Sequence, residues 1–435
     1  MKIGAISLGC DKNRVDTEKM LARLQSAGHT LVGSEEEADV IIVNTCAFID
    51  KAKEESIDEI FGALSAKDAS GGKKKVVVTG CLSQRYADAL KDEFDGVDAI
   101  LGIADYDKIV ETIDKITQGA KVESCLCADK FYENRVLTTP YHYAYLKIAD
   151  GCDNHCTYCA IPKIRGKYRS ESIENLLAEA KKLADDGVKE LILVAQDVSR
   201  YGIDFDGKPH IFELVRELEK LDFEWIRLLY LYPEMVTDEF IDFVKTEPKV
   251  AKYMDVPLQH IDGELLKRMN RRVTEDEVRA LVQKIKDAGI TLRTTFICGF
   301  PGETEEQFDK LKDFVKTSQF DYAGFFAYSR EEDTPADKLP NHLEESVKEQ
   351  RANTLSMLQT KIIKERNKRL VGTVQRVIYD DIDYDKQMFV GRSEGQAPDI
   401  DNVVLFKADE EVHIGEFYDV RITGTNGIDL VGETL

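Results

Sequence analysis

The sequence predicts an α/β protein built in three parts: an amino-terminal parallel βαβ sheet, a central run of βα units, and a small antiparallel β-barrel at the carboxyl end. Three observations predict this fold class. Short Ile- and Val-rich runs alternate with helical segments at the amino end. Strand-like runs then recur between amphipathic helices, and short β-rich runs separated by Gly, Asp and Asn turns fill residues 371–435.

Composition sets the broad class. A chain of 435 residues with 43% hydrophobic content can build two or three domains with real cores. The first residues read as a strand instead of a secretory signal, and no apolar run approaches the roughly 18 residues of a membrane span. We therefore expect a cytoplasmic protein with no membrane partner. Nine cysteines in a reducing compartment indicate metal binding or catalysis and disfavour a disulfide framework.

The chain is strongly acidic. Its formal charge is −22, from 81 acidic and 59 basic residues. Nucleic-acid binding depends on Lys and Arg that neutralise phosphates, whereas an acidic field attracts basic partners. The same charge also increases solubility, so it is evidence for a basic partner only in combination with other features.

Each of the first three expected strands is followed by a cysteine. Cys10, Cys46 and Cys81 lie 36 and 35 residues apart, which matches a βα repeat. Because the carboxyl ends of parallel strands share one edge of a sheet, we expect the three thiols to converge. Each alone would be a buried small hydrophobe, but as a repeat they are candidates for a three-Cys iron–sulfur cluster with one open iron. The expected strands are Lys2–Ser7, Val40–Asn44 and Lys75–Thr79, and the expected helices are Asn13–Ala27 and Ala52–Lys67.

A second cysteine group follows the expected strand Tyr141–Ile148. Cys152, Cys156 and Cys159 have the spacing C-x-x-x-C-x-x-C. A four-iron cluster is ordinarily closed by four Cys, so three leave one iron open for a substrate or cofactor. Zinc would require a closed set of four ligands, and no second Cys-x-x-Cys pair lies nearby. The pattern favours a catalytic iron–sulfur cluster. The remaining thiols are interpreted as bystanders (Cys125, Cys127) and as a buried strand residue (Cys298).

The central region continues with further strand-like runs between amphipathic helices. With Tyr141–Ile148 they make six expected parallel strands. A long helix near Glu344–Arg369 then leads to the carboxyl-terminal barrel. The other central strands are expected at Glu190–Val194, Trp225–Leu231, Tyr253–Pro257, Thr291–Ile297 and Tyr322–Phe326, and the barrel strands at Thr373–Tyr379, Met388–Gly391, Val403–Phe406 and Phe417–Thr423.

The spacing of Cys152, Cys156 and Cys159, with Tyr158 before the last cysteine, resembles the radical S-adenosylmethionine (radical SAM) superfamily. The resemblance implies an open, partial TIM barrel of six βα units whose reactive face is the carboxyl end. It also implies that the open iron chelates SAM. An external electron donor would reduce the cluster, and the resulting 5′-deoxyadenosyl radical would remove hydrogen from an unactivated C–H bond.

The same resemblance implies contacts to SAM at the strand ends. Gln196 and Asp197 occupy the place of the motif that binds the SAM amino group, and Tyr158 falls where the family places a residue against the adenine. Gln259 and Gly299 follow the fourth and fifth strands, where the family contacts ribose, carboxylate or adenine. These motifs could equally be ordinary βα turns.

The flanks of Cys10, Cys46 and Cys81 resemble the amino-terminal domain of the methylthiotransferases, and motifs within residues 371–435 resemble the TRAM domain. Together the resemblances cover essentially the whole chain and imply domains at 1–118, 138–368 and 370–435. They further imply two 4Fe-4S clusters. One SAM would be the radical source and a second SAM the methyl donor.

Two branches share this arrangement. One modifies an adenosine of tRNA, and the other adds a methylthio group to the β-carbon of an aspartate in small-subunit ribosomal protein twelve. Lys12 and Asn13 beside Cys10, and His260 after Gln259, resemble the protein-modifying branch.

Charge favours the same branch. The segment from residue 370 to 435 holds five Lys or Arg against fourteen Asp or Glu, whereas an RNA-binding barrel should be basic. We therefore predict the ribosomal protein or the ribosome as partner, with the tRNA enzyme as the alternative. A two-cluster electron-transfer protein without a substrate is disfavoured, because it needs neither SAM motifs nor an open barrel.

Overall fold

The computed structural model describes residues 1–124 and 134–435, so Cys125 and Cys127 lie outside the described residues. The described chain divides into two compact units. Unit 1 comprises Met1–Thr138, Tyr145–Glu179 and Ser329–Asp337; unit 2 comprises Thr139–Ala144, Ala180–Tyr328 and Lys338–Leu435. No helix among the described residues is both long and apolar enough to cross a membrane.

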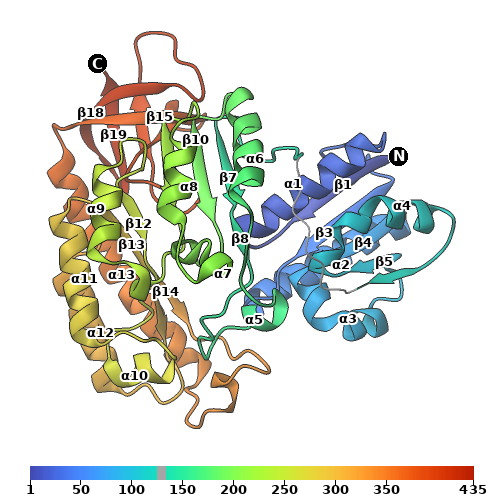
Figure 1. Ribbon diagram of the computed structural model, residues 1–435, viewed down its shortest axis with the longest axis horizontal. Coiled ribbons are helices and arrows are strands. Elements are labelled where there is room, and N and C mark those ends of the chain that lie inside the picture. The colour runs from blue at the N-terminus through green and yellow to red at the C-terminus, as the bar shows by residue number, and fades with distance from the viewer. Residues whose placement is uncertain (125–133) are drawn as a thin grey trace. The chain divides into compact units, whose positions relative to one another are not determined.

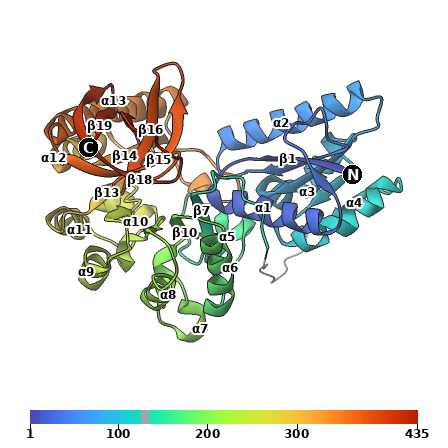
Figure 2. The ribbon, with the colours of Figure 1, turned by 90° about the horizontal axis from the view of Figure 1, so that it is seen from above.

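A parallel sheet with the strand order β2-β1-β3-β4-β5-β6 forms the centre of unit 1. Helices α1 and α2 cover opposite faces of it (Figures 1 and 2). The predicted strands and helices are confirmed, and the short strands β2, β5 and β6 extend the sheet beyond them. The elements are β1 (Lys2–Ser7), α1 (Asp11–Ser26), β2 (Thr30–Leu31), β3 (Val40–Thr45), α2 (Asp50–Ala69), β4 (Lys75–Gly80), α3 (Cys81–Glu93), β5 (Ala99–Leu101), η1 (Ile103–Lys108), α4 (Ile109–Thr117) and β6 (Val122–Ser124).

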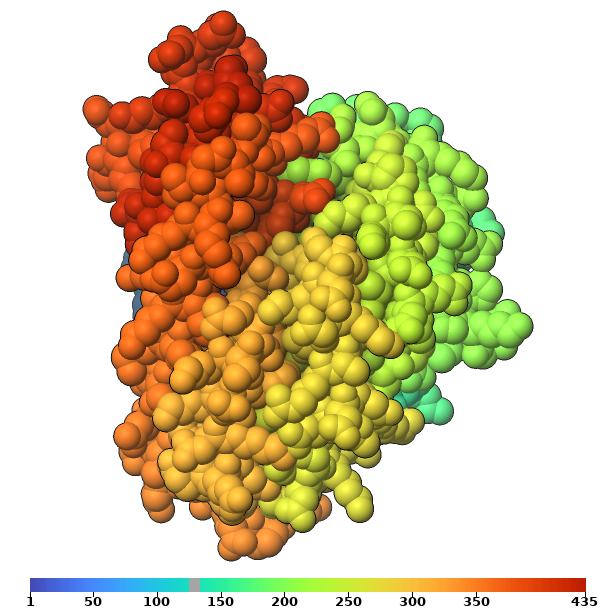
Figure 3. Space-filling view, turned by 90° about the vertical axis from the view of Figure 1, so that its left-hand side faces the viewer, coloured from blue at the N-terminus to red at the C-terminus, as the bar shows by residue number. Residues whose placement is uncertain are grey.

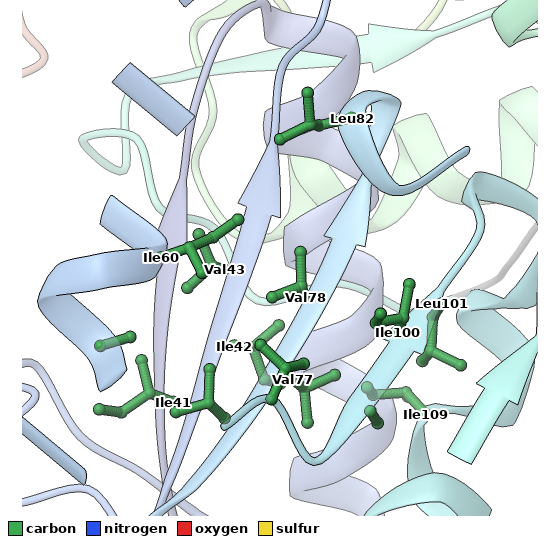
Figure 4. Packing of buried hydrophobic residues seen from close by; sticks show 14 of the residues in the cluster. Ile41, Ile42, Val43, Ile60, Val77, Val78, Leu82, Ile100, Leu101 and Ile109 are labelled. Carbon is green, nitrogen blue, oxygen red and sulfur yellow. The ribbon is translucent and has the colours of Figure 1, made fainter. Parts of the chain in front are cut away.

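Aliphatic side chains from both faces of this sheet form its core. Every residue of β3 is buried, as expected for a central parallel strand with helices on both sides. Figure 4 shows side chains of β3 and β4, among them Ile42 and Val77, beside Ile60 of α2. Burial of one such side chain stabilises the fold by about 1.5–3 kcal/mol. This core fixes the edge of the sheet from which the cysteine loops emerge.

The rest of unit 1 comes from later in the chain. It includes the end of β7 (Tyr143–Lys147), the start of α6 (Ile173–Asp185) and residues 329–337. Between them lie β8 (Ala149–Asp150), which pairs with β9 (Arg169–Ser170), and the short helix α5 (Ile161–Ile164). The segment that carries Cys152, Cys156 and Cys159 therefore belongs to the same unit as the amino-terminal sheet.

Unit 2 contains the remaining βα units. Their strands form sheets in the orders β11-β10-β7 and β12-β13-β14, with a bridge between Ile226 and Val250 near the junction. Together they supply the six predicted strands. The elements are β10 (Glu190–Val194), η2 (Val198–Arg200), α7 (Ile203–Asp206), α8 (Ile211–Leu218), β11 (Trp225–Leu228), η3 (Pro233–Met235), α9 (Asp238–Thr246), β12 (Tyr253–Asp255), α10 (Gly263–Arg268), α11 (Glu275–Asp287), β13 (Thr291–Cys298), α12 (Glu305–Ser318), β14 (Tyr322–Ala327), η4 (Ala336–Lys338) and α13 (Glu345–Leu370).

A closed barrel with the order β15-β16-β17-β19-β18 ends unit 2. The prediction of an antiparallel barrel is wrong at one pairing, because β17 and β19 run parallel. The reason is topological: when an odd number of alternating strands closes on itself, two neighbours must share a direction. In Figure 3 the red barrel adjoins the orange helix α13. The strands are β15 (Val374–Asp383), β16 (Met388–Ser393), β17 (Val404–Lys407), β18 (Phe417–Asn426) and β19 (Asp429–Thr434).

Candidate functional site

Cys10 and Cys46, on loops, and Cys81, the first residue of α3, follow the ends of β1, β3 and β4 at the same edge of the unit 1 sheet. Asn13 ties the first two loops together, since its side-chain amide donates to the carbonyls of Leu8 at 2.9 Å and Thr45 at 3.0 Å. The Thr45 hydroxyl in turn donates to the Thr79 carbonyl at 2.5 Å, two residues before Cys81. Hydrogen bonds thus connect the segments on which Cys10, Cys46 and Cys81 are predicted to converge.

Gly9 shows how closely two of these loops approach. Its φ of +84° is one that side chains rarely adopt, and a Cβ there would lie 2.7 Å from Cys46 Cβ and 2.8 Å from Cys46 Sγ. Only glycine fits such a contact without a shift of the neighbouring loop. The glycine before Cys10 therefore allows the first two cysteine loops to pack against each other.

Burial controls the protonation of two thiols of this triad, those of Cys46 and Cys81. Burial raises the pKa of Cys81 to about 12, against the opposing charge of Arg165, and burial also raises the pKa of Cys46. Such thiols are protonated at neutral pH, so binding of a metal must displace their protons. Thiolate sets of this kind select soft metal centres, including iron–sulfur clusters.

The second cysteine loop is held by its own backbone. The Cys152 amide donates to the Gly166 carbonyl at 3.1 Å, and the Cys159 amide donates to the Cys156 carbonyl at 3.1 Å. Cys152 and Cys156 are buried, whereas Cys159 and Tyr158 are half-buried. The loop is thus folded compactly with one side accessible.

A buried network of charges lies against the amino-terminal cysteines. Arg165 contacts Asp16 at 3.2 Å and Asp150 at 3.0 Å. Lys147 contacts Asp150 at 3.1 Å and also pairs with Asp16. All four side chains are at most one-tenth exposed. Burial alone would raise the pKa of Asp150, but Arg165 and Lys147 outweigh it and hold that pKa well below its usual range. The Asp150 carboxylate is therefore ionised.

The same network reaches a cysteine. Arg165 Nη2 lies 3.8 Å from Cys81 Sγ and 3.2 Å from Asn13 Oδ1. These contacts were not predicted from the sequence, although Lys147 inside an apolar strand was a usable signal.

Residues 329–337 contact the surroundings of both cysteine triads. Glu331 accepts from Arg85 of α3 at 2.6 Å and from Lys53 of α2 at 3.1 Å. Arg85 also donates to the Ala47 carbonyl beside Cys46 at 3.0 Å. Five residues after Glu331, the Ala336 amide donates to the Thr157 carbonyl, inside the second cysteine loop, at 2.9 Å. The sequence carried no local signal for this role.

The cysteines among the described residues do not form a ready-made site for a single metal ion. Among residues 1–124 and 134–435, no three His, Cys, Asp or Glu side chains are arranged around one metal ion. Thiolates that share one zinc lie about 4 Å apart, because each Zn–S bond is about 2.3 Å. In a four-iron cluster each thiolate binds a different iron and the sulfurs lie farther apart. Both cysteine triads remain predicted ligands.

The other predicted SAM contacts lie in unit 2, at the strand ends. Asp197 is buried and accepts from the Ser199 hydroxyl. Its neighbour Gln196 has a buried Oε1 that accepts no hydrogen bond from the described residues. A buried acceptor without a donor is costly, which is expected where a ligand supplies the donor.

The remaining two predicted contacts have well-defined backbone roles. Gln259 has a φ of +69°, unusual for a side-chain-bearing residue, and is held by backbone pairing with Thr295 and Ile297. Strain of this type persists where the surroundings enforce it and is concentrated at functional sites. Gly299 donates its amide to Glu303 at 2.5 Å, and Glu303 pairs with Arg351 at 2.9 Å. Both stay predicted SAM contacts.

Comparison with known proteins identifies relatives over the full length of the chain. Family models match residues 2–102 (uncharacterized protein family UPF0004), 146–315 (radical SAM superfamily) and 371–435 (TRAM domain). The chain is 46% identical over 441 residues to "Ribosomal protein uS12 methylthiotransferase RimO" of Clostridioides difficile strain 630, covering 100% of this chain and 99% of the relative. The protein of the same name from Lachnoclostridium phytofermentans is 46% identical over 438 residues, covering 99% of each chain.

A solved structure also shares the fold. The radical SAM methyltransferase TsrM from Kitasatospora setae, solved with cobalamin and a 4Fe-4S cluster bound, matches with a TM-score of 0.56 and 15% identity. The match covers 86% of this chain and 76% of that one. At this identity the likeness concerns the fold alone.

Proposed function

Because the chain belongs to the RimO family of ribosomal protein uS12 methylthiotransferases, we propose that it adds a methylthio group to the β-carbon of an aspartate in uS12, the small-subunit protein. The observation that carries this function is the full-length identity to relatives of that name. The names of these relatives favour a protein substrate over tRNA. The chain is thus a sulfur-inserting transferase that uses an iron–sulfur cluster and SAM.

A reduced iron–sulfur cluster with bound SAM supplies a 5′-deoxyadenosyl radical, which can break the aspartate's unactivated β-C–H bond. We assign the cluster ligands of this step to Cys152, Cys156 and Cys159. Gln196 would accept a hydrogen bond through its buried, unpartnered Oε1, as the SAM amino group could supply. Asp197, Gln259, Gly299 and Tyr158 complete the proposed SAM contacts.

We further propose a second 4Fe-4S cluster on Cys10, Cys46 and Cys81. The common sheet edge and the close approach of Gly9 to Cys46 support it. Both triads lie in unit 1, and Glu331 and Arg165 contact the segments around them. The chain then has three functional domains, at 1–118, 138–368 and 370–435, and needs an external electron donor.

The carboxyl-terminal barrel is proposed to hold the basic substrate. Of its few cations, Arg392 is buried and Arg376 pairs with Glu224, so neither offsets the surface acids. Exposed acidic residues remain on its loops and strand edges, namely Asp381, Asp385, Asp399, Asp409, Glu410, Glu411, Glu416, Asp419 and Glu433. Such a surface favours a cationic protein and disfavours RNA.

Mass spectrometry tests the substrate assignment. Reconstituted enzyme, SAM, a reductant and sulfide are incubated either with a uS12 peptide that contains the target aspartate or with unmodified tRNA. Replacement of hydrogen by CH₃S should add about 46 Da to the aspartate, as the assigned cofactor chemistry requires. Gain of methylthio-adenosine in tRNA with an unmodified peptide would establish the alternative.

Cysteine variants test the two-cluster assignment. Replacement of Cys152, Cys156 or Cys159 by Ala should abolish SAM cleavage while the other triad retains iron. Replacement of Cys10, Cys46 or Cys81 by Ala should leave 5′-deoxyadenosine formation measurable and stop methylthio transfer. Unchanged iron content and unchanged methylthiolation in the Cys10→Ala variant would exclude the second cluster.

A further inference from the structure

Arg165 places a buried guanidinium against the amino-terminal cysteine triad. It follows Cys159 by six residues in sequence and lies just after α5. Its Nη2 is 3.8 Å from Cys81 Sγ, and its Nη1 is 3.0 Å from Asp150. The residue is only 4% exposed. The segment after the second cysteine loop therefore delivers a positive charge to the first triad.

Fold stability alone does not account for this arrangement. Each buried ion loses several kcal/mol of hydration, and apolar residues of similar volume often stabilise a fold equally well or better. The formal charges of Arg165, Lys147, Asp16 and Asp150 sum to zero, so the network supplies no excess charge to neutralise another protein group. Its distinguishing contact is the one from the guanidinium to Cys81 sulfur.

A hydrogen bond from a cation to a thiolate favours the anionic state of that sulfur. The potentials of iron–sulfur clusters follow the hydrogen bonds to their sulfurs, the nearby charge and the exposure to solvent. Removal of Arg165 would leave Asp16 and Asp150 with Lys147 alone, which is a net negative charge beside the thiolates. An added electron would then be less favourable.

We propose that Arg165 is a positioning residue that raises the reduction potential of the cluster held by Cys10, Cys46 and Cys81. This inference rests on the proposed function of that triad. Arg165 belongs to the segment that follows Cys159, but it contacts Cys81 of the other triad. The segment next to one triad would therefore determine how readily the cluster on the other triad accepts an electron.

The test isolates that cluster in the full-length chain. In a Cys152→Ala/Cys156→Ala/Cys159→Ala background, the reconstituted protein is titrated with reductant and followed by electron paramagnetic resonance, with iron measured in parallel. Arg165→Met should lower the reduced-to-oxidised ratio about tenfold at a fixed solution potential, equivalent to a shift of ~59 mV for one electron. Arg165→Lys should give a smaller shift, because an ammonium keeps the charge but loses the planar fork.

Lys163→Met is the matched control. It removes the same charge from α5, but the Lys163 side chain is 61% exposed and its ion pair with Asp333 lies at the surface. Its ratio should change less than twofold. Absence of iron from the triple-Ala background itself would refute the proposed second cluster, whatever Arg165 does.

Bound iron with the same midpoint in Arg165→Met as in the background would overturn the inference alone. If the Met variant does not fold or does not bind iron, Arg165→Lys decides: a lowered midpoint supports the role, and an unchanged one refutes it.

Discussion

Arg165 in unit 1 and Arg392 in unit 2 are both buried between two carboxylates, yet they serve different surroundings. Arg392 contacts Glu190 at 2.6 Å and Asp380 at 2.7 Å, and it also donates to the carbonyl of Gln396 and lies over the Tyr143 ring. Arg165 also contacts two carboxylates, but its fork reaches the sulfur of Cys81. Arg392 therefore connects two parts of the same protein, whereas Arg165 lies next to a candidate metal site.

The unit 2 network explains how the barrel is attached. Glu190 of β10 binds Arg392 of β16 and also Arg227 of β11, at 2.7 Å. Asp380 of β15 contacts His142 at 2.7 Å as well. Buried ion pairs thus connect the βα strands to the barrel. We expect changes here to act on stability, and changes around Arg165 to act on the cluster.

The largest expected effect is on stability, from Arg392→Met. This change leaves Glu190 and Asp380 buried with fewer partners, and loss of one partner of a buried ion network costs about 3–5 kcal/mol. The chain's single tryptophan, Trp225, packs edge-to-face on barrel residue Phe417 at 4.7 Å between ring centroids. Its fluorescence during denaturation should therefore show an earlier transition.

Lys284→Met is the control for this variant. Its ion pair with Asp238 is exposed, with side-chain exposures of 54% and 74%, and such pairs contribute about 0–1 kcal/mol. Equal shifts in the two variants would mean that the buried network does not hold the barrel.

The variant Gly9→Ala tests the packing around the cysteines of unit 1. Gly9 and Gly28 have nearly equal φ values, +84° and +88°, but a Cβ on Gly9 would meet Cys46 at 2.7 Å whereas nothing lies within 4 Å of one on Gly28. Gly28→Ala should cost only the left-handed backbone penalty, about 1–2 kcal/mol.

Gly9→Ala should cost more than that, and it should also lower the iron retained by the amino-terminal triad. Thermal unfolding followed by circular dichroism, with iron analysis in the triple-Ala background, measures both quantities. Equal melting temperatures and equal iron content in the two alanine variants would show that the loops around Cys10 and Cys46 are not tightly packed.

The sequence best predicted those functional features that depend on residues close together in the chain. A strand followed by a cysteine is a local pattern, and the parallel-sheet rule then converts Cys10, Cys46 and Cys81 into neighbours. Arg165 was not predictable in this way, since its contact with Asp16 joins residues 149 apart. The role of residues 329–337 could likewise not be predicted, because nothing near Glu331 in the sequence indicates that it binds Arg85.

The barrel shows the same limit at the level of topology. Its short β-rich runs predicted four strands, but β19 (Asp429–Thr434) was not among them. The closing pair of β17 and β19 is parallel because of the number of strands, a property of the whole domain. Local propensity carries no information about such closure.

A third prediction extends the comparison to the surfaces of the two units. The variant Asp409→Asn/Glu410→Gln/Glu411→Gln neutralises an exposed barrel loop and should raise the KM for uS12 by roughly threefold or more at low salt, because rim charges steer a basic partner. SAM cleavage without substrate should not change.

The matched control is Glu54→Gln/Glu55→Gln/Asp58→Asn, which neutralises three exposed acids of α2 in unit 1. The difference between the two variants should shrink as salt screens the surface charges. A KM that responds equally to both variants would indicate a general effect of net charge instead of a docking surface on the barrel.

The smallest expected effect is the pH dependence of barrel attachment. Burial would raise the pKa of Glu190, but Arg392 and Arg227 outweigh it and hold that pKa below its usual value. A carboxyl whose pKa is lower in the folded state stabilises the fold above its unfolded pKa of about 4.3, and this stability is lost as the pH falls through the folded pKa. The Trp225 transition should therefore move to lower denaturant below about pH 5. Glu190→Gln cannot titrate, so its midpoint should depend less on pH than that of the unsubstituted chain. Parallel pH profiles for the two proteins would show that Glu190 is not ionised against Arg392 in the folded state.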